Sequence, residues 1–164
     1  MIAHEPTKRL IKPITKSINF DDQYIIINDL LNGNLEAGSG NTFPGWEKAG
    51  TILETSDSYT GTRAAQYNVN SSNAIVDLKR DNILTVGHKY RLEFYAKIDV
   101  PGSGRGLQSS SGLGTQKIGD DLSDEYEYRI FEFVASQHRI NIFRHGNCHN
   151  RLIYVDQLTL TRIG

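Results

Sequence analysis

The fold is decided by one stretch, Tyr90-Arg91-Leu92-Glu93-Phe94-Tyr95-Ala96-Lys97-Ile98. Apolar or aromatic residues stand at 90, 92, 94, 96 and 98, and Arg, Glu, Tyr and Lys stand between them. Successive side chains of a β-strand point to opposite faces of a sheet, so this period of two is typical of a strand with one buried face. We therefore predict a half-buried strand over residues 90–98.

The rest of the chain carries shorter β patterns. Clusters of Gly, Asn, Ser and Asp, which favour turns, separate these segments, and no stretch has the period of a long amphipathic helix. Many short strands with turns between them indicate an all-β fold, an antiparallel β-sandwich of the jelly-roll type. The further strands are predicted at residues 24–27, 51–53, 64–69, 74–78, 128–134, 139–143 and 152–160.

The last of these strands has an irregular pattern. Ile153 and Val155 share one phase while Leu158 and Leu160 share the other, so a regular strand cannot place all four on one face. A β-bulge near Asp156 restores a single apolar face and re-aims the Asp156 carboxylate. The alternative is a strand that is buried on both faces.

Length and charge limit the class of function. The 164 residues suit one domain. Eighteen Lys and Arg against nineteen Asp and Glu give a formal net charge of -1, without the basic surplus of a general nucleic-acid binder. Cys148 is the only cysteine, which excludes an intrachain disulfide and a multi-cysteine zinc site.

Targeting signals are not evident in the sequence. No apolar run approaches the roughly 20 residues that span a bilayer, so we expect no membrane insertion. The N-terminal region lacks the uninterrupted apolar core of a secretory signal. We therefore expect synthesis in the cytoplasm without a signal peptide.

Residues 1–20 differ in composition from the rest of the chain. They carry four basic side chains and regularly placed isoleucines, and prolines at 6 and 13 interrupt any helix. We predict an extended basic arm over residues 1–20 that orders on a partner surface, followed by one β-sandwich over residues 21–164. The alternative is a terminus that has no partner. The predicted anchoring residues are Lys8, Arg9, Ile11, Lys12, Ile14 and Lys16.

Five segments follow one another along the chain: Asn32-Gly33-Asn34-Leu35-Glu36, Gly45-Trp46, Tyr59-Thr60-Gly61-Thr62-Arg63-Ala64-Ala65, Leu84-Thr85-Val86-Gly87-His88-Lys89-Tyr90-Arg91-Leu92-Glu93-Phe94-Tyr95-Ala96-Lys97 and Tyr154-Val155-Asp156-Gln157-Leu158-Thr159-Leu160. In this order they resemble the carbohydrate-binding modules of the jelly-roll, galactose-binding-like superfamily, over residues 29–163. The resemblance implies two packed antiparallel sheets, with sugar bound in a sheet groove or at the loop rim. It also implies that Trp46 packs in the core.

The resemblance further implies a structural calcium ion. In that superfamily the glutamate of the first turn and the carboxylate of the last strand often hold a buried calcium, with backbone carbonyls completing the shell. The corresponding candidates are Glu36 and Asp156, with Asn34 as a further one; calcium takes about six to eight such oxygens. Where the family often has two adjacent acids, this chain has Asp156-Gln157. The alternative is that Glu36 caps a turn and Asp156 pairs with a local amide or arginine.

Sugar binding requires an exposed aromatic ring that stacks on a pyranose, flanked by groups that hydrogen-bond its hydroxyls. Tyr95 is expected to share the outer face of the 90–98 strand with charged side chains, and other tyrosines supply further rings. The alternative is that these are ordinary residues of a solvated sheet face. The candidate glycan-binding residues are Tyr59, Tyr67, Arg91, Glu93, Tyr95 and Lys97.

Two functions of different classes fit these features. No segment resembles an activated nucleophile with its base, so we expect a protein that is not an enzyme. The favoured hypothesis is a structural or adhesion subunit on the surface of a bacteriophage virion, a decoration or fibre-type protein. It would dock on a capsid or tail through its arm and display a carbohydrate-binding-like domain. The alternative is a stand-alone carbohydrate-binding module that acts with a polysaccharide-degrading system.

Overall fold

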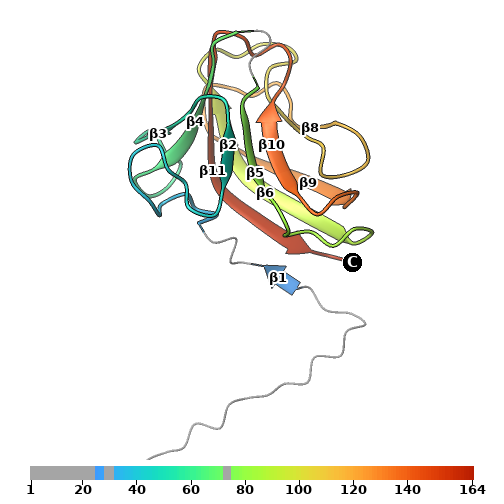
Figure 1. Cartoon of the computed structure of the whole chain (residues 1–164). Coiled ribbons are helices and arrows are strands. Elements are labelled where there is room, and N and C mark those ends of the chain that lie inside the picture. Colours follow the sequence, from blue (N-terminus) through green and yellow to red (C-terminus); the bar gives the residue numbers. More distant parts are fainter. Residues whose placement is uncertain (1–24, 28–31, 72–74) are drawn as a thin grey trace, which may run out of the picture.

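The computed structural model describes residues 25–27, 32–71 and 75–164. In these ranges the chain forms a sandwich of two antiparallel sheets and contains no helix (Figure 1). The prediction of an all-β antiparallel sandwich is therefore confirmed. The arm over residues 1–20 and its six predicted anchoring residues lie outside the described ranges.

The larger sheet has six strands. Its order is β3-β4-β11-β6-β9, and β1 pairs with the C-terminal part of β11. The long strands β6 and β11 lie side by side at its centre and meet over most of their length. The strands are β1 (Ile25–Ile27), β3 (Ile52–Thr55), β4 (Ala64–Val69), β6 (Lys89–Ile98), β9 (Glu127–Val134) and β11 (Arg151–Arg162).

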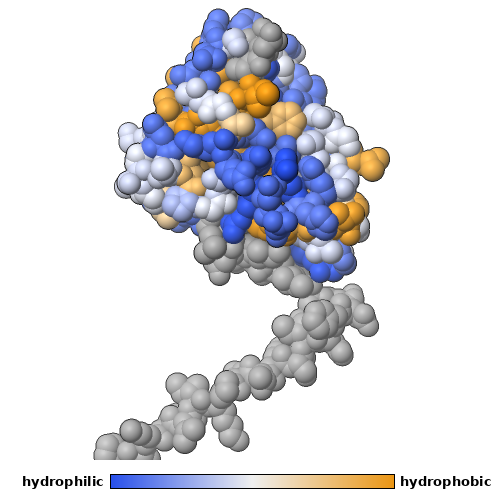
Figure 2. All heavy atoms as spheres, in the orientation of Figure 1, coloured by the Kyte–Doolittle hydropathy of each residue, from blue (hydrophilic) through white to orange (hydrophobic). Residues whose placement is uncertain are grey.

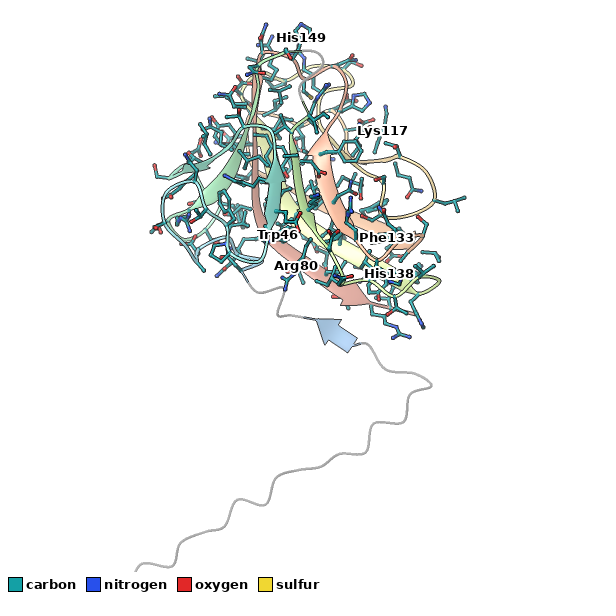
Figure 3. The ribbon with its side chains drawn as sticks, viewed as in Figure 1. Trp46, Arg80, Lys117, Phe133, His138 and His149 are labelled. Atoms are coloured by element: carbon teal, nitrogen blue, oxygen red, sulfur yellow. The ribbon has the colours of Figure 1, made fainter. Side chains whose placement is uncertain are left out.

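The smaller sheet has five strands in the order β2-β5-β10-β7-β8. None of its strands is longer than the five residues of β10, which lies in the middle between β5 and β7. The turn from β10 to β11 lies at the upper end of the sandwich, where Figure 3 shows His149. The strands are β2 (Glu47–Ala49), β5 (Asp77–Arg80), β7 (Leu107–Ser109), β8 (Gln116–Gly119) and β10 (Ile140–Arg144).

The predicted alternation along β6 is confirmed. Every second side chain of this strand is buried between the sheets, and those between them are only partly buried. The inward residues join apolar side chains of the facing sheet in one continuous core. Trp46, which is 7% exposed, belongs to the same core, as the resemblance implied. The buried residues of β6 are Tyr90, Leu92, Phe94, Ala96 and Ile98.

The predicted bulge in the last strand is also confirmed. Across β6, Asp156 pairs with Tyr95 but Thr159 pairs with Glu93, so β11 advances by one residue more than its partner. Gln157 takes up the extra residue with a φ of 52°. The bulge brings apolar residues of both phases onto the core face: Ile153, Val155, Leu158 and Leu160 are buried.

Three strands of the smaller sheet were not predicted. Residues 47–49, 107–109 and 116–119 are short and mostly polar. β2 and β7 pair with β5 and β10, which are distant in the sequence, and β8 pairs with its near neighbour β7. The strand predicted over residues 74–78 begins later, at Asp77. Within the described ranges, no helix is both long and apolar enough to cross a membrane.

Candidate functional site

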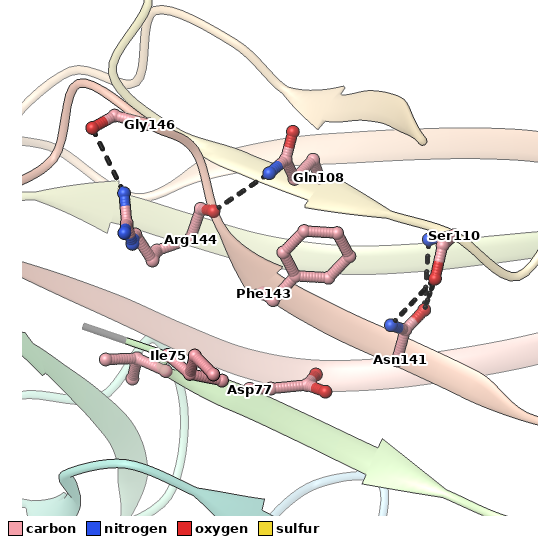
Figure 4. Close-up of a pocket in the computed structure, with 9 residues that line it drawn as sticks. Ile75, Asp77, Gln108, Ser110, Asn141, Phe143, Arg144 and Gly146 are labelled. Carbon is pink, nitrogen blue, oxygen red and sulfur yellow. Dashed lines mark hydrogen bonds between the residues drawn. The ribbon is translucent and has the colours of Figure 1, made fainter. Parts of the chain in front are cut away.

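A groove of about 530 Å³ lies on the outer face of the five-stranded sheet. Pairing places Asp77, Phe143 and Gln108 opposite one another on β5, β10 and β7, and directly paired residues of antiparallel strands share a face. Figure 4 shows the Phe143 ring between Gln108 and Asp77. Ile142, which precedes Phe143 in its strand, is buried in the core, so the Phe143 ring faces outward.

Asp77 supplies the groove with an acceptor that has no partner. Its Oδ1 is buried, and no hydrogen bond reaches it from the described residues. Burial raises the pKa of this carboxyl to about 6, against the opposing attraction of Lys79 and Arg139. An unsatisfied buried carboxylate oxygen is costly. Because Oδ1 is covered, an incoming O–H or N–H donor would reach it only after the Asp77 side chain rotates toward the groove.

Asn141 lines the groove and is held rigidly. Its Oδ1 accepts a hydrogen bond of 3.0 Å from the amide of Ser110, and its Nδ2 donates one of 3.1 Å to Oγ of the same serine. Its own backbone amide donates to Oγ of Ser111, 3.0 Å away. These contacts, drawn in part in Figure 4, tie β10 to the turn after β7 and fix the orientation of the Asn141 amide.

The groove combines an apolar surface with fixed polar groups. Figure 2 shows a mostly hydrophilic face with an apolar area in its upper half, near the upper ends of β5 and β10 in Figure 1. Gln108 Nε2 donates to the carbonyl of Arg144 across 3.2 Å, and an Arg144 Nη1 hydrogen bond of 3.0 Å reaches the carbonyl of Gly146. An aromatic ring with orienting amides and a carboxylate is the composition of a site for a polar, neutral ligand that has one flat apolar face.

The predicted glycan-binding residues do not line the groove. All of them except Tyr67 lie at the outer face of the six-stranded sheet. Tyr95 pairs with Tyr128 of β9, and Lys97 pairs with Tyr154 of β11, so these side chains share one face. The ring of Tyr59, from the loop before β4, stacks on the Tyr95 ring with centroids 3.6 Å apart. The structure therefore brings four further candidates to the Tyr59 side of the sandwich: Arg91, Glu93, Tyr95 and Lys97.

The exception is Tyr67, and its prediction as an exposed platform is wrong. Tyr67 is 0% exposed, and its hydroxyl donates a hydrogen bond of 2.9 Å to the carbonyl of Ile142. In β4 it shares its phase with Ala65 and Val69, which are also buried. Tyr67 therefore connects the two sheets through the core.

Two of the three residues predicted to bind calcium contact the loop before β4. Glu36 accepts hydrogen bonds from the amides of Thr62 and Arg63, 3.0 and 3.1 Å long. Asp156 accepts from the amides of Tyr59 and Thr60, at 2.9 and 3.2 Å. Both carboxylates therefore hold residues 59–63 in place. The third candidate, Asn34, is exposed, and its Oδ1 accepts from the amide of Glu36 across 3.4 Å.

The carboxyl groups of Glu36 and Asp156 have pKa values that are shifted in opposite directions. Burial raises the pKa of Asp156, and the nearby charge of Glu36 adds a smaller effect in the same direction. Burial also acts to raise the pKa of Glu36, but hydrogen bonds from Arg63 and Thr62 outweigh it, so this pKa is lowered. Among the described residues, neither carboxylate forms a salt bridge with lysine or arginine.

The donor set fits a calcium ion in part. Two carboxylates from distant segments lie near each other, and each oxygen that accepts an amide hydrogen has a further lone pair. Within the described ranges, no three His, Cys, Asp or Glu side chains gather around one point. A calcium ion at Glu36 and Asp156 would therefore need backbone carbonyls, an amide such as that of Asn34, or water for its remaining oxygens.

Sequence reasoning missed the residues of the groove. The strand that carries Asn141 and Phe143 was predicted, but its outward face was not considered as a site. The signal was present: in the predicted strand over residues 139–143, Phe143 stands out of phase with the apolar pair Ile140 and Ile142. Asp77 and Gln108 gave no signal, because they join Phe143 only through pairing of distant strands.

No protein-family model matches the chain, and no curated protein matches it either. Solved structures do. The module TmCBM61, in complex with β-1,4-galactotriose, is 17% identical, with a TM-score of 0.59 over 82% of this chain and 98% of that chain. An arabinose-bound α-L-arabinofuranosidase of the GH51 type gives a TM-score of 0.62 at 12% identity. The active domain of tailspike protein 4 from bacteriophage CBA120 gives 0.59 at 14%.

These matches differ in how much of each protein is covered. This chain spans 26% of the arabinofuranosidase and 22% of the tailspike chain, so it corresponds to one part of each. By contrast, a second carbohydrate-binding module, of family 16, is covered over 96% of its length at a TM-score of 0.55. At such low identities the likeness concerns the fold. The chain has the jelly-roll fold of carbohydrate-binding modules.

Proposed function

We propose that the protein is a non-catalytic carbohydrate-binding subunit and that its ligand lies in the groove of the five-stranded sheet. One observation carries the proposal: Phe143 offers its ring to solvent between the unpartnered Oδ1 of Asp77 and the amide of Gln108. A pyranose presents an apolar face of C–H groups and a rim of hydroxyls, which matches a ring flanked by hydrogen-bonding groups.

The ligand is a neutral polysaccharide chain. The groove is open on the sheet surface, so it suits a chain that continues beyond the bound residues. The formal net charge of -1 gives no strong attraction for a highly charged partner. The matched structures support this choice, since TmCBM61 was solved with β-1,4-galactotriose and another match is named as a xylan-binding domain.

The biological setting that we propose is adhesion at the surface of a bacteriophage virion. Residues 1–20 would dock on a capsid or tail, and the sandwich would display the groove. Synthesis in the cytoplasm, with release by lysis, would bring such a protein to the outside. The likeness to part of the bacteriophage CBA120 tailspike supports this setting.

The second candidate is a stand-alone module that acts with a polysaccharide-degrading system. The likeness to part of an α-L-arabinofuranosidase and to xylan-binding modules favours it. Neighbouring genes for capsid or tail proteins would select the virion setting, whereas neighbouring glycosidase genes would select the second candidate.

We also propose that calcium binds at Glu36 and Asp156. The ion would supply positive charge between two carboxylates and would link the first turn of the sandwich to its last strand. Its effect would be on stability, because Asp156 lies in the sheet that does not carry the groove and Glu36 contacts the loop before β4 of that sheet.

The test of groove binding is electrophoresis of the full chain through native gels that contain xylan or β-1,4-galactan. Replacing the ring in Phe143→Ala should reduce retention, because the stacking surface is lost. Phe143→Tyr, which keeps a ring, is the matched control and should remain retained. Equal retention of Phe143→Ala and the wild type in every gel would show that the groove is not the site.

A further inference from the structure

A cluster of tyrosines covers part of the outer face of the six-stranded sheet. The chain has eight tyrosines. Tyr67 and Tyr90 are in the core, and Tyr24 lies outside the described ranges. The other five gather on one face, which we call the tyrosine face: Tyr59, Tyr95, Tyr126, Tyr128 and Tyr154.

The rings of the tyrosine face contact one another. Tyr59 stacks on Tyr95 with an interplanar angle of 11°, and Tyr126 meets the Tyr59 ring edge-on with centroids 5.9 Å apart. Tyr128 lies 5.3 Å from Tyr95. Tyr59 and Tyr128 remain 43% and 48% exposed, so part of each ring faces solvent. The result is an aromatic surface with exposed ring area at Tyr59 and at Tyr128.

Polar groups lie between these rings. Lys97 Nζ lies 4.9 Å from the Tyr126 centroid and 5.1 Å from that of Tyr154, and it forms a 2.8 Å salt bridge with Asp57. Tyr128 donates a hydrogen bond to the carboxylate of Glu93. Rings interleaved with carboxylates and an ammonium group provide both the stacking surface and the hydrogen-bonding groups that sugar hydroxyls require.

The tyrosine face is ordered before any ligand arrives. Asp156 holds the amides of Tyr59 and Thr60, and the hydroxyl of Tyr126 donates to the carbonyl of Asp57 across 2.7 Å. The loop that carries Tyr59 is therefore fixed at both sides of the ring. A ligand that stacks here loses little affinity to ordering of the protein, which is the advantage of a preformed site.

The charges of this face favour a neutral occupant. Each cation lies against an anion: Lys97 against Asp57, and Arg91 against Glu132 at 2.6 Å. A charged protein or nucleic-acid surface would find no net charge to complement. A neutral chain of hydroxyl groups needs none.

We propose that the tyrosine face is a second carbohydrate-binding surface for neutral polysaccharide, so that the protein binds such chains on both faces of its sandwich. The inference rests on the proposed function, because it assigns the same ligand class to the opposite sheet. Two sites on opposite faces would allow one molecule to join two polysaccharide chains and would raise the overall avidity.

The test separates binding from cross-linking. The full chain is mixed with soluble xylan or β-1,4-galactan; retention in native gels measures binding, and turbidity of the mixture measures cross-linking. The variants are Phe143→Ala, the double change Tyr59→Ala with Tyr128→Ala, and the three changes together. The matched control is Tyr59→Phe with Tyr128→Phe, which keeps the rings. Trp46 fluorescence confirms that each variant is folded, since this residue is buried.

We expect the wild type to cross-link the polysaccharide. The Tyr59→Ala/Tyr128→Ala variant should bind about tenfold more weakly and lose turbidity, and the triple variant should lose retention. Unchanged retention and turbidity in the Tyr59→Ala/Tyr128→Ala variant would overturn the second surface but leave the groove intact. Loss of binding in that variant, with Phe143→Ala unaffected, would overturn the groove instead. A lower sedimentation coefficient for the Tyr59→Ala/Tyr128→Ala variant than for the wild type would show that this face binds a second copy of the chain instead. Absence of wild-type retention in every gel would overturn both sites.

Discussion

The backbone amide of Tyr59 donates a hydrogen bond of 2.9 Å to Oδ2 of Asp156, a fully buried carboxylate in the bulge of β11. Asp156 pairs with Tyr95 across the sheet, and the Tyr59 ring stacks on the Tyr95 ring. The bulge therefore does more than restore the apolar face of β11. It directs a carboxylate to the outer face, where that group holds the loop that carries an aromatic ring.

Replacing this carboxylate should destabilise the domain. In Asp156→Asn, an NH₂ group replaces one of the two oxygens that accept backbone amides, from Tyr59 and Thr60 at Oδ2 and from Gln157 at Oδ1, so at least one hydrogen bond to a charged acceptor is lost. We expect the free energy of unfolding to fall by about 1–3 kcal/mol. Urea denaturation followed by Trp46 fluorescence measures this. Asp124→Asn, at an exposed carboxylate, is the control, and equal midpoints for the two variants would contradict the role of Asp156.

Calcium should raise the melting temperature if Glu36 and Asp156 share an ion. A ligand that binds only the native state stabilises it by mass action, so a chelator should lower the melting temperature of the wild type. Glu36→Gln should remove most of this sensitivity, whereas Glu125→Gln, at an exposed position, should keep it. Differential scanning fluorimetry with and without chelator is the measurement. A wild-type melting curve that does not respond to either calcium or chelator would reject the ion.

The carboxyl of Asp77 should make ligand binding in the groove depend on pH. Burial raises its pKa to about 6, and a sugar hydroxyl that donates to this carboxylate favours the charged form. Affinity should therefore rise as the pH increases through about 6, and Asp77→Asn should bind with little pH dependence. Affinity measured by calorimetry across this interval tests the expectation; a flat wild-type profile, or an equally steep one in Asp77→Asn, would contradict it.

The same residue gives a stability test with a defined sign. The folded-state pKa of Asp77 lies above its ordinary value of 3.8, so its contribution to stability is present at low pH and is lost as the pH rises through about 6. Asp77→Asn should therefore gain stability relative to the wild type over this interval. Urea denaturation of both proteins at several pH values measures the difference in their free energies of unfolding. A difference that stays constant across these pH values would contradict the raised pKa.

The strands that could be predicted from the sequence are those whose own residues alternate between apolar and polar. The alternation of β6 and the phase change between Val155 and Leu158 are local, and both gave the correct structure. The outer face of β6 followed from the same alternation. The same alternation places Tyr67 in the core, since it shares a phase with the buried Ala65 and Val69. The aromatic character that makes it a candidate platform does not determine which face it occupies.

The groove could not be predicted in this way. Asp77, Gln108 and Phe143 lie on three strands that are distant in sequence, and their adjacency depends on the order of strands in the sheet. The strand β7 is short and contains two polar residues among its three, so its pattern does not distinguish it from a loop. Pairing in the sheet, rather than any local preference, makes it a strand.

Removing the arm should separate docking from folding. Residues 1–20 contain too little apolar surface for a core of their own but carry four basic side chains and spaced isoleucines, a composition typical of a segment that orders on contact. A chain that lacks them should keep Trp46 buried and the melting temperature of the full chain, yet fail to incorporate into its parent assembly. Added salt should weaken docking of the full chain only partly, because apolar contacts persist when charges are screened. Sedimentation of assembled particles with each form measures incorporation. Normal occupancy by the shortened chain would exclude the anchoring role and favour the stand-alone carbohydrate-binding module.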